Sequence, residues 1–275
     1  MIAVTTPSGR RRFVSDPEHW YNVRMAWILD LDGVMWLGGD SVPGSAEAVT
    51  RLREAGHRIL FLTNNSSRPV DHILGSLADM DVEAEEDEIA SSALASAEML
   101  EPGSTALVCA GVGVQEALER RGVETVTEGD ADAVVVGYHR EFDYDRLCAA
   151  YKAVAAGARL IGTNDDPTYP TPDGPVPGGG ALLAAVAVAA GVEAEVAGKP
   201  YEPMADLVRS RLGDDVEGAI LVGDRPSTDG AMAGRLGVTF ALVFSGVTGE
   251  DEVPGDPAPD HVAPDLGQLV DELLS

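Results

Sequence analysis

Short apolar runs alternate with longer segments of helical period along most of the 275-residue chain. This alternation is typical of an α/β fold, in which helices connect the parallel strands of a sheet. Strands are expected at 26–30, 58–62, 104–109, 132–136, 158–161, 195–198, 218–222 and 239–243. Helices are expected at 45–55, 67–80, 113–121, 144–156, 180–190, 202–212, 228–236 and 266–274, and a Pro-rich surface loop at 254–265.

The sequence shows no signal peptide, no membrane-spanning run and no disulfide framework, and these absences indicate the cellular compartment. Residues 1–24 have no apolar centre of the kind that a signal peptide carries, so we interpret them as a disordered N-terminal extension before Met25. No run reaches about 18 apolar residues, so a membrane partner is not expected. Cys109 and Cys148 show neither metal-ligand spacing nor a disulfide framework, which favours a cytoplasmic protein.

The charge is strongly negative. Asp and Glu number 46 against 19 basic residues, giving a net charge of −27. A cation-binding role is one interpretation, but the acids are dispersed and lysine is scarce, which favours a solvated surface adapted to high salt. At about 1 M salt the Debye length is only ~3 Å, so such a surface repels itself little. The same charge excludes nucleic acid as an expected partner.

The stretch AWILDLDGVMW, residues 26–36, places two carboxylates where an apolar strand ends. In an extended chain Asp30 and Asp32 point the same way, so both can face one ligand. Ligands of open α/β sheets lie at the carboxyl ends of the strands. The simpler alternative is a turn with two capping acids, because Asp-Gly is a common turn signal.

Two further strand ends carry groups suited to an anion. FLTNNSSRP ends a strand in Thr63, Asn64 and Asn65, where a hydroxyl and free amides precede a helix. VAGKP places Lys199, one of two lysines in the chain, directly after a small apolar strand. A lysine is a compact charge that suits a phosphoryl oxygen. The alternatives are an ordinary helix cap for the first stretch and a solvated surface lysine for the second.

A fourth strand end, AILVGDRPSTDG, carries Asp224 and Asp229, for which a Gly-Asp turn with a helix cap is the alternative. The ordered set of acid pair, hydroxyl with amides, lysine and acid pair resembles the motifs of the haloacid dehalogenase (HAD) superfamily. The segment 162–186, TNNSSR and GDRPSTD are similar to the subfamily IIA phosphatases, which include NagD-like, p-nitrophenylphosphatase and phosphoglycolate phosphatase enzymes. The resemblance spans residues 26 to about 250.

The resemblance implies a Mg²⁺-dependent phosphomonoesterase that acts through an aspartyl-phosphate. Asp30 matches the nucleophile of the family, and Asp32 matches its general acid and base. The Mg²⁺ ligands would be Asp30, Asp224 and the backbone carbonyl of Asp32, with Asp229 as an outer support. A cation is needed because a carboxylate approaching a phosphate dianion meets like charge.

The same resemblance assigns Thr63, Asn64, Asn65 and Lys199 to the binding of phosphate. It also implies a Rossmann-like core, residues 25–103 and 194–275, with a C2-type α/β cap domain inserted at 104–193. The cap would exclude water and select the leaving group.

Tyr169, in the loop expected to reach the site, is a candidate for substrate contact, with a packed loop aromatic as the alternative. Cap-mediated dimers occur in similar families, so a homodimer is compatible with the resemblance.

The expected substrate is a small phosphorylated metabolite, such as a sugar phosphate or phosphoglycolate. A phosphotransferase or mutase on the same core is the second interpretation, and a sensor that binds a phosphometabolite without turnover is the third. The complete acid and lysine set argues against the sensor, and fold analogy alone cannot choose between the enzymes.

Overall fold

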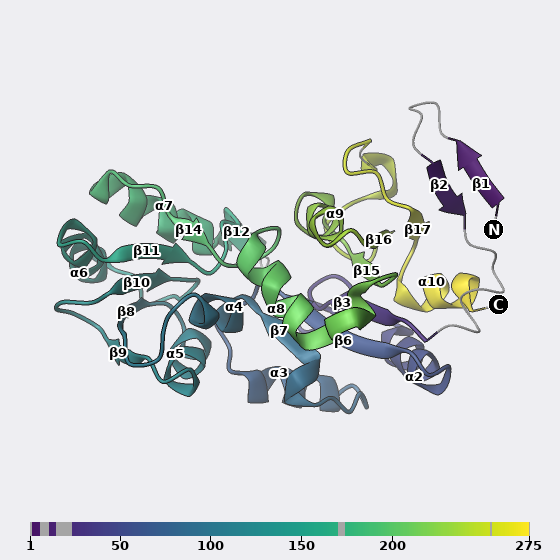
Figure 1. The fold of residues 1–275 in the computed structure, drawn as a ribbon, viewed down its shortest axis with the longest axis horizontal. Coiled ribbons are helices and arrows are strands. Elements are labelled where there is room, and N and C mark those ends of the chain that lie inside the picture. The colour runs from purple at the N-terminus through teal and green to yellow at the C-terminus, as the bar shows by residue number, and fades with distance from the viewer. Residues whose placement is uncertain (1, 6–10, 15–23, 170–173, 254, 275) are drawn as a thin grey trace.

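The computed structural model describes residues 2–5, 11–14, 24–169, 174–253 and 255–274, and contains two parallel sheets in two lobes that lie side by side (Figure 1). The predicted α/β class with a parallel-sheet core is confirmed. No helix among the described residues is long and apolar enough to cross a membrane.

The first sheet has six parallel strands in the order β17-β16-β15-β3-β6-β7. Its strands are β3 (Ala26–Asp30), β6 (Arg58–Thr63), β7 (Ile89–Ser91), β15 (Ile220–Gly223), β16 (Thr239–Val243) and β17 (His261–Ala263). The chain builds outward from β3 to β7 on one side, and later from β15 to β17 on the other. The strand order therefore reverses between β3 and β15, where open α/β sheets bind ligands.

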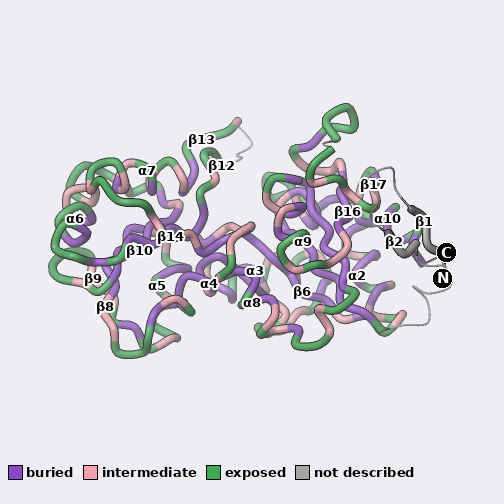
Figure 2. The backbone as a smooth tube through the Cα atoms, turned by 45° about the horizontal axis from the view of Figure 1, so that its top comes forward, coloured by how far each residue is buried: buried purple, intermediate pink, exposed green. Residues whose placement is uncertain are grey.

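Helices cover both faces of this sheet. In β3, Trp27 and Leu29 face one apolar cluster while Ala26 and Ile28 face the other, as strand alternation requires. The first cluster is closed by α2 (Ser45–Glu54), α3 (Val70–Ala78) and α10 (Leu266–Leu273). The second is closed by α4 (Ser92–Glu98), α8 (Glu202–Leu212) and α9 (Ala231–Leu236). Figure 2 shows the buried chain running through the interior of this lobe.

The second sheet has five parallel strands in the order β14-β11-β10-β8-β9. Its strands are β8 (Thr105–Cys109), β9 (Glu124–Val126), β10 (Ala133–Val136), β11 (Arg159–Gly162) and β14 (Glu195–Val196). Helix α5 (Val112–Arg120) covers one face, and α6 (Tyr144–Ala155) and α7 (Gly179–Ala190) cover the other. Helix α4 packs on the core of each lobe, through Ala95 on one side and Ala93 and Ala97 on the other.

Three short antiparallel hairpins complete the described part of the chain. They are β1 (Ile2–Thr5) with β2 (Arg11–Val14), β4 (Trp36–Leu37) with β5 (Asp40–Ser41), and β12 (Thr168–Tyr169) with β13 (Val176–Pro177). The prediction that residues 1–24 are disordered differs from the structure at Ile2–Thr5 and Arg11–Val14, which pair as β1 and β2. For residues 1, 6–10 and 15–23, which lie outside the described residues, it stays a prediction.

Two sequence-based expectations for local structure were wrong. The stretch 254–265 is not a loop throughout, because β17 pairs with the edge of β16 inside it. The helix expected at 228–236 begins with a π-helical turn, Pro226–Gly230, and only then continues as α9. Pro226, the first residue of this turn, has no backbone N–H to donate. Single π-helical turns are frequent at functional sites.

Candidate active site

Three neighbouring strands of the six-stranded sheet end at the residues that the sequence singled out. Asp30 is the last residue of β3, Thr63 is the last of β6, and Asp224 directly follows β15. Because these strands are parallel neighbours in the order β15-β3-β6, their carboxyl ends meet at one edge. Lys199 follows β14 and enters the same hollow, which Asp30, Asp32 and Asp224 also line.

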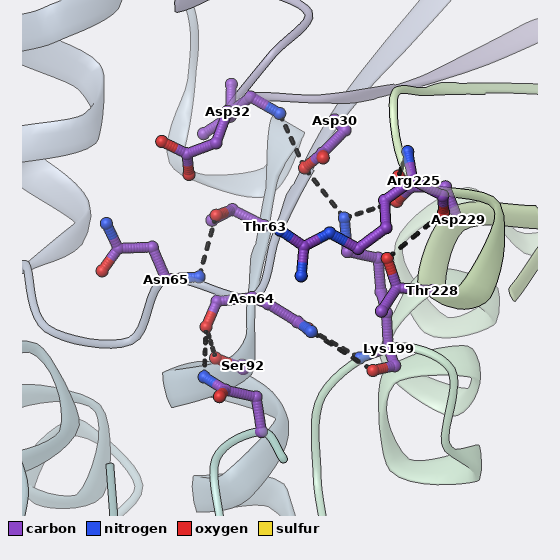
Figure 3. A network of polar contacts seen from close by, with 12 residues as sticks. Asp30, Asp32, Thr63, Asn64, Asn65, Ser92, Lys199, Arg225, Thr228 and Asp229 are labelled. Atoms are coloured by element: carbon purple, nitrogen blue, oxygen red, sulfur yellow. Dashed lines mark hydrogen bonds and ion pairs between the residues drawn. The ribbon is translucent and has the colours of Figure 1, made fainter. Parts of the chain in front are cut away.

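Lys199 makes ion pairs with the carboxylates of Asp30 and Asp229. Its Nζ lies 2.8 Å from Asp30 Oδ1 and 2.7 Å from Asp229 Oδ1 (Figure 3). The lysine is 2% exposed and Asp229 is fully buried. A buried charge of this kind is tolerated only when it is paired and hydrogen-bonded, and here Lys199 is both.

The pKa values of Asp30, Asp224 and Lys199 are all shifted, because these groups are buried close together. Burial raises the pKa of Asp30 well above its usual range, and Lys199 only partly opposes this. Burial, followed by the charge of Asp229, raises the pKa of Asp224 to about 6. Burial alone would lower the pKa of Lys199, but its contacts with Asp229 and Asp30 outweigh burial and raise it. The cluster therefore holds more negative charge than Lys199 can balance.

The same acids fit a divalent cation. Carboxylate oxygens of Asp30, Asp224 and Asp229 all lie within 4.8 Å of one another. Both oxygens of Asp229 are engaged, by Lys199 Nζ and by the backbone N–H of Arg225 at 3.0 Å. Among the described residues, Asp30 Oδ2 and Asp224 Oδ1 have no hydrogen-bond partner. Two unpartnered carboxylate oxygens, on residues that line the hollow, are the kind of ligand that a hard cation such as Mg²⁺ prefers.

The carboxylate of Asp224 is in close contact with the backbone of two loops, at Gly33 and at Gly246–Val247. Its Oδ2 accepts a 2.7 Å hydrogen bond from the N–H of Val247. A Cβ on Gly246 would lie 1.9 Å from Asp224 Oδ2, and a Cβ on Gly33, whose φ is +91°, would lie 2.4 Å from the same atom. Only glycine fits at these two positions, so the loops after β3 and β16 clamp the Asp224 carboxylate.

Asp32 lies apart from the acid cluster. In Figure 3 it lies with Asn65 on one side of Thr63, while Lys199 and Asp229 lie on the other. Its Oδ1 accepts a 3.1 Å hydrogen bond from the indole N–H of Trp36. Burial raises the pKa of Asp32, while the Trp36 contact and Lys199 act in the opposite direction. Asp32 is therefore a partly buried carboxyl group at the edge of the hollow, held by Trp36.

The Thr63–Asn65 turn is organised by its own side chains. Thr63 Oγ1 accepts a 2.9 Å hydrogen bond from the N–H of Asn65. Asn65 Oδ1 accepts from the N–H and hydroxyl of Ser67, and Asn65 Nδ2 donates to the hydroxyl of Tyr169 at 3.1 Å. This places Tyr169 in the hollow, where burial raises the pKa of its phenol and its ring stacks on Tyr138 at 4.6 Å.

Asn64 has its polar groups engaged within the protein. Its Oδ1 accepts a 2.7 Å hydrogen bond from the N–H of Lys199, and its Nδ2 donates to Lys199 O at 3.2 Å and to Asp166 Oδ2 at 3.1 Å. Its backbone carbonyl accepts from Ser92 Oγ at 2.7 Å and from Asn164 Nδ2 at 2.8 Å. The Asn64 side chain lines the hollow, but its amide is occupied in holding Lys199 and the loop after β11.

The structure therefore brings together every site residue predicted from the sequence, and it adds four that were not singled out. They are Asn164, Tyr138, Trp36 and Ser92. Asn164 carried a signal, because GTND repeats the pattern of a strand followed by Thr and Asn that LTNN shows. Trp36, Tyr138 and Ser92 had none, since their role depends on packing between segments distant in sequence.

Comparison with known proteins identifies the fold. A family described as haloacid dehalogenase-like hydrolase matches residues 27–124, and a second family of the same kind matches 196–269. The 5'-nucleotidase YutF of Bacillus subtilis is 32% identical over 89% of this chain and 96% of its own length. The chain belongs to the haloacid dehalogenase-like hydrolases.

Solved structures agree with this assignment. A p-nitrophenyl phosphatase from Archaeoglobus fulgidus superimposes with a TM-score of 0.83 at 31% identity, covering 90% of this chain and 98% of that one. A glycerol phosphate phosphatase from Mycobacterium tuberculosis, in complex with magnesium, gives 0.83 at 30% identity, covering 92% and 77%. The family and the enzyme class predicted from the motifs, a HAD-type phosphatase, are confirmed.

Proposed function

We propose that this HAD hydrolase is a Mg²⁺-dependent phosphomonoesterase that acts on a small phosphorylated metabolite through an aspartyl-phosphate. The observation that carries the proposal is the contact of Lys199 Nζ with both Asp30 and Asp229, beside Asp224, at the ends of three parallel strands. This arrangement gives a nucleophile, a fixed cation and two spare carboxylate oxygens within one small buried region.

The metal in this proposal is held by Asp30, Asp224 and the backbone carbonyl of Asp32. Its support is the unpartnered oxygens of Asp30 and Asp224, which lie close together, and the magnesium complex of the glycerol phosphate phosphatase. When bound, Mg²⁺ would supply the positive charge that keeps Asp30 ionised and offsets the charge of the phosphoryl group. Asp229 does not bind the metal in this proposal. Its two oxygens instead accept hydrogen bonds from Lys199 Nζ and from the backbone N–H of Arg225, and so hold the lysine and the turn after β15 in place.

Asp30 is the nucleophile of the first step. A carboxylate oxygen of Asp30 forms a bond to phosphorus as the bond from phosphorus to the leaving alcohol oxygen breaks, which gives an aspartyl-phosphate. Lys199 Nζ and the Thr63 hydroxyl stabilise the phosphoryl oxygens. They are positioned before the reaction, so they stabilise the transition state without reorganising.

Asp32 moves the proton in both steps. In its protonated form it donates a proton to the leaving alcohol, and as a carboxylate it then accepts one from the water that attacks phosphorus. Its raised pKa and its hydrogen bond from Trp36 support this role. The attacking water cleaves the aspartyl-phosphate, which releases phosphate and restores the Asp30 carboxylate.

The five-stranded lobe would act as the cap. Residues 104–193 would form most of this inserted domain, and β14 (Glu195–Val196), just beyond that range, pairs with β11 in the same sheet. Asn164 and Asp166 contact Asn64 of the core lobe, and Tyr169 contacts Asn65. These contacts support a closed arrangement in which Tyr138 and Tyr169 face the leaving group and water is excluded. Residues 170–173, which continue this loop, lie outside the described residues.

The substrate is proposed only as a class. Relatives are named as a 5'-nucleotidase, acid sugar phosphatases and a glycerol phosphate phosphatase, which supports a small phosphomonoester. The test is release of phosphate from p-nitrophenyl phosphate and from a metabolite panel with Mg²⁺, in the absence and presence of EDTA. Mg²⁺-dependent release supports the proposal. Transfer of phosphate to an added sugar in place of water would indicate a phosphotransferase, and binding without turnover a sensor.

A further inference from the structure

A second hollow opens from the catalytic one on the side of Asp32. Asp32, Leu37, Asn65 and Tyr169 line both hollows, so the two are continuous. The second is bounded by the β4–β5 hairpin and by the face of α3 and the turn before it. In the proposed function the leaving oxygen must lie beside Asp32, which donates its proton. The second hollow is therefore open to the leaving group.

Arg68 lines this second hollow together with the two residues that follow it at four-residue spacing, His72 and Ser76. The Arg68 guanidinium donates to the ring of His72, and Ser76 Oγ lies 3.3 Å from His72 Nδ1. His72 and Ser76, four residues apart, lie on the same side of α3. Arg68 precedes this helix, and its contact with His72 links the three side chains. Arg68 is itself exposed at the edge of the hollow, where its guanidinium contacts His72.

Arg68 lacks an acidic partner, a property that it shares with Arg24, Arg140, Arg146 and Arg211 among the described residues. Most described arginines make an ion pair with Asp or Glu, but Arg68 makes none with any described residue. It is close enough to the catalytic centre to act on it. Burial raises the pKa of Asp32, and the charge of Arg68 is one of the groups that oppose this rise.

Two acids also line the second hollow. Asp40 and Asp79 face it without reaching ion-pair distance of Arg68. They would repel a leaving group that carries several negative charges, while the single guanidinium can bind one. These acids limit the negative charge that the second hollow can accept, and Arg68 is the arginine that could offset it there.

From this geometry we infer that Arg68, supported by His72, binds a second anionic group on the leaving alcohol of the substrate. A carboxylate and a second phosphoryl group share the required chemistry, because a guanidinium donates paired hydrogen bonds to either. This inference rests on the proposed function, since it takes Asp32 to mark the position of the leaving oxygen. It makes Arg68 a specificity residue of the phosphatase.

The test compares substrates that differ in this one group. The first pair is 3-phosphoglycerate and glycerol 3-phosphate, and the second is fructose 1,6-bisphosphate and fructose 6-phosphate. For each, kcat/KM is measured for the wild-type enzyme, Arg68→Gln and Arg68→Lys, with Arg209→Gln on α8 as an exposed control. Where turnover is slow, the compound is measured as a competitive inhibitor of p-nitrophenyl phosphate hydrolysis, so that every pair gives a value.

The wild-type enzyme should prefer the more anionic member of at least one pair, mainly through KM. Arg68→Gln should reduce that preference about tenfold, as expected for loss of a charged hydrogen bond. Arg68→Lys should retain part of it, and Arg209→Gln all of it. Equal constants within both pairs, or a preference unchanged in Arg68→Gln, would overturn the inference while p-nitrophenyl phosphate hydrolysis leaves the proposed function intact. Absence of that hydrolysis would instead remove the proposed function, and this inference with it.

Discussion

Asn64 is hydrogen-bonded to Asp166 across the two lobes, with 3.1 Å between Asn64 Nδ2 and Asp166 Oδ2. The same side chain accepts a 2.7 Å hydrogen bond from the backbone N–H of Lys199. One amide thus ties the loop after β11 to the lysine that contacts Asp30. Asn64 is in this respect a positioning residue, which sets where Lys199 and the inserted lobe meet.

Asn64→Asp replaces the donor with a carboxylate that faces Asp166, and the two like charges should separate the loop from the core. We expect kcat/KM for p-nitrophenyl phosphate to fall by about 10- to 100-fold, the usual cost of breaking a charged hydrogen bond between partly buried groups. Adding Asp166→Asn restores a donor and an acceptor in reversed order, so the double variant should recover much of the loss. If Asp166→Asn gives no recovery, Asn64 does not act through this loop.

Lys199→Met should lower kcat by about 10²- to 10³-fold, because a fixed positive charge is lost from the transition state. The variant also leaves buried carboxylates without their partner, so its thermal unfolding should be compared with that of the wild type in the presence of Mg²⁺. Lys152→Met on α6 is the matched control, because Lys152 is exposed and is the only other lysine. Near-normal turnover by Lys199→Met would show that the lysine is not part of the phosphate site.

His57, which lies outside the candidate active site, should make the stability of the protein depend on pH. It is 6% exposed, and neither ring nitrogen has a partner among the described residues. Burial lowers its pKa, so the unfolded chain takes up a proton at a higher pH than the folded one. Its contribution to stability is therefore complete above the unfolded value and is lost as the pH falls below it.

His57→Phe should remove the part of the loss of stability at low pH that comes from protonation of His57. The free energy of unfolding of both proteins is measured at pH 8, where His57 is neutral in the folded and the unfolded chain, and again at pH 5. Between the two values the variant should lose less stability than the wild type. A difference that stays constant from pH 8 to pH 5 would show that His57 does not titrate in this range.

Much of the six-stranded core could be read from the sequence, because its strands are continuous apolar runs and its helices have clear periods. The strands of the two parallel sheets that were missed, β7, β9 and β17, each have three residues. A segment that short shows no period, and it becomes a strand only by pairing with the edge of β6, β8 or β16. Local pattern could not reveal these pairings.

The site was predictable where each motif follows a strand of the same parallel sheet, as Asp30, Thr63 and Asp224 do. It was not predictable where it depends on the position of the inserted lobe, as do the contacts of Asn64 with Asp166 and Asn164. The roles of the site residues, the division at 104–193 and the adaptation to high salt stay predictions.

The central claim is a two-step reaction in which Asp30 is phosphorylated and Asp32 serves both steps. Asp32→Asn leaves Asp30, Asp224 and the backbone carbonyl of residue 32 in place, so the metal ligands should survive. With p-nitrophenyl phosphate, whose leaving group scarcely needs a proton, phosphorylation of Asp30 should continue at a reduced rate. Attack by water then lacks its base, so the second step should limit turnover.

Rapid mixing of Asp32→Asn with p-nitrophenyl phosphate is therefore the most direct measurement. It should give a burst approaching one nitrophenolate per active site, followed by slow turnover, and acid quenching should trap a phosphorylated protein. With an alkyl phosphate the first step also needs the acid, and no burst should appear. Equal loss of rate on both substrates, with no phosphoenzyme after acid quench, would contradict the roles proposed for Asp30 and Asp32.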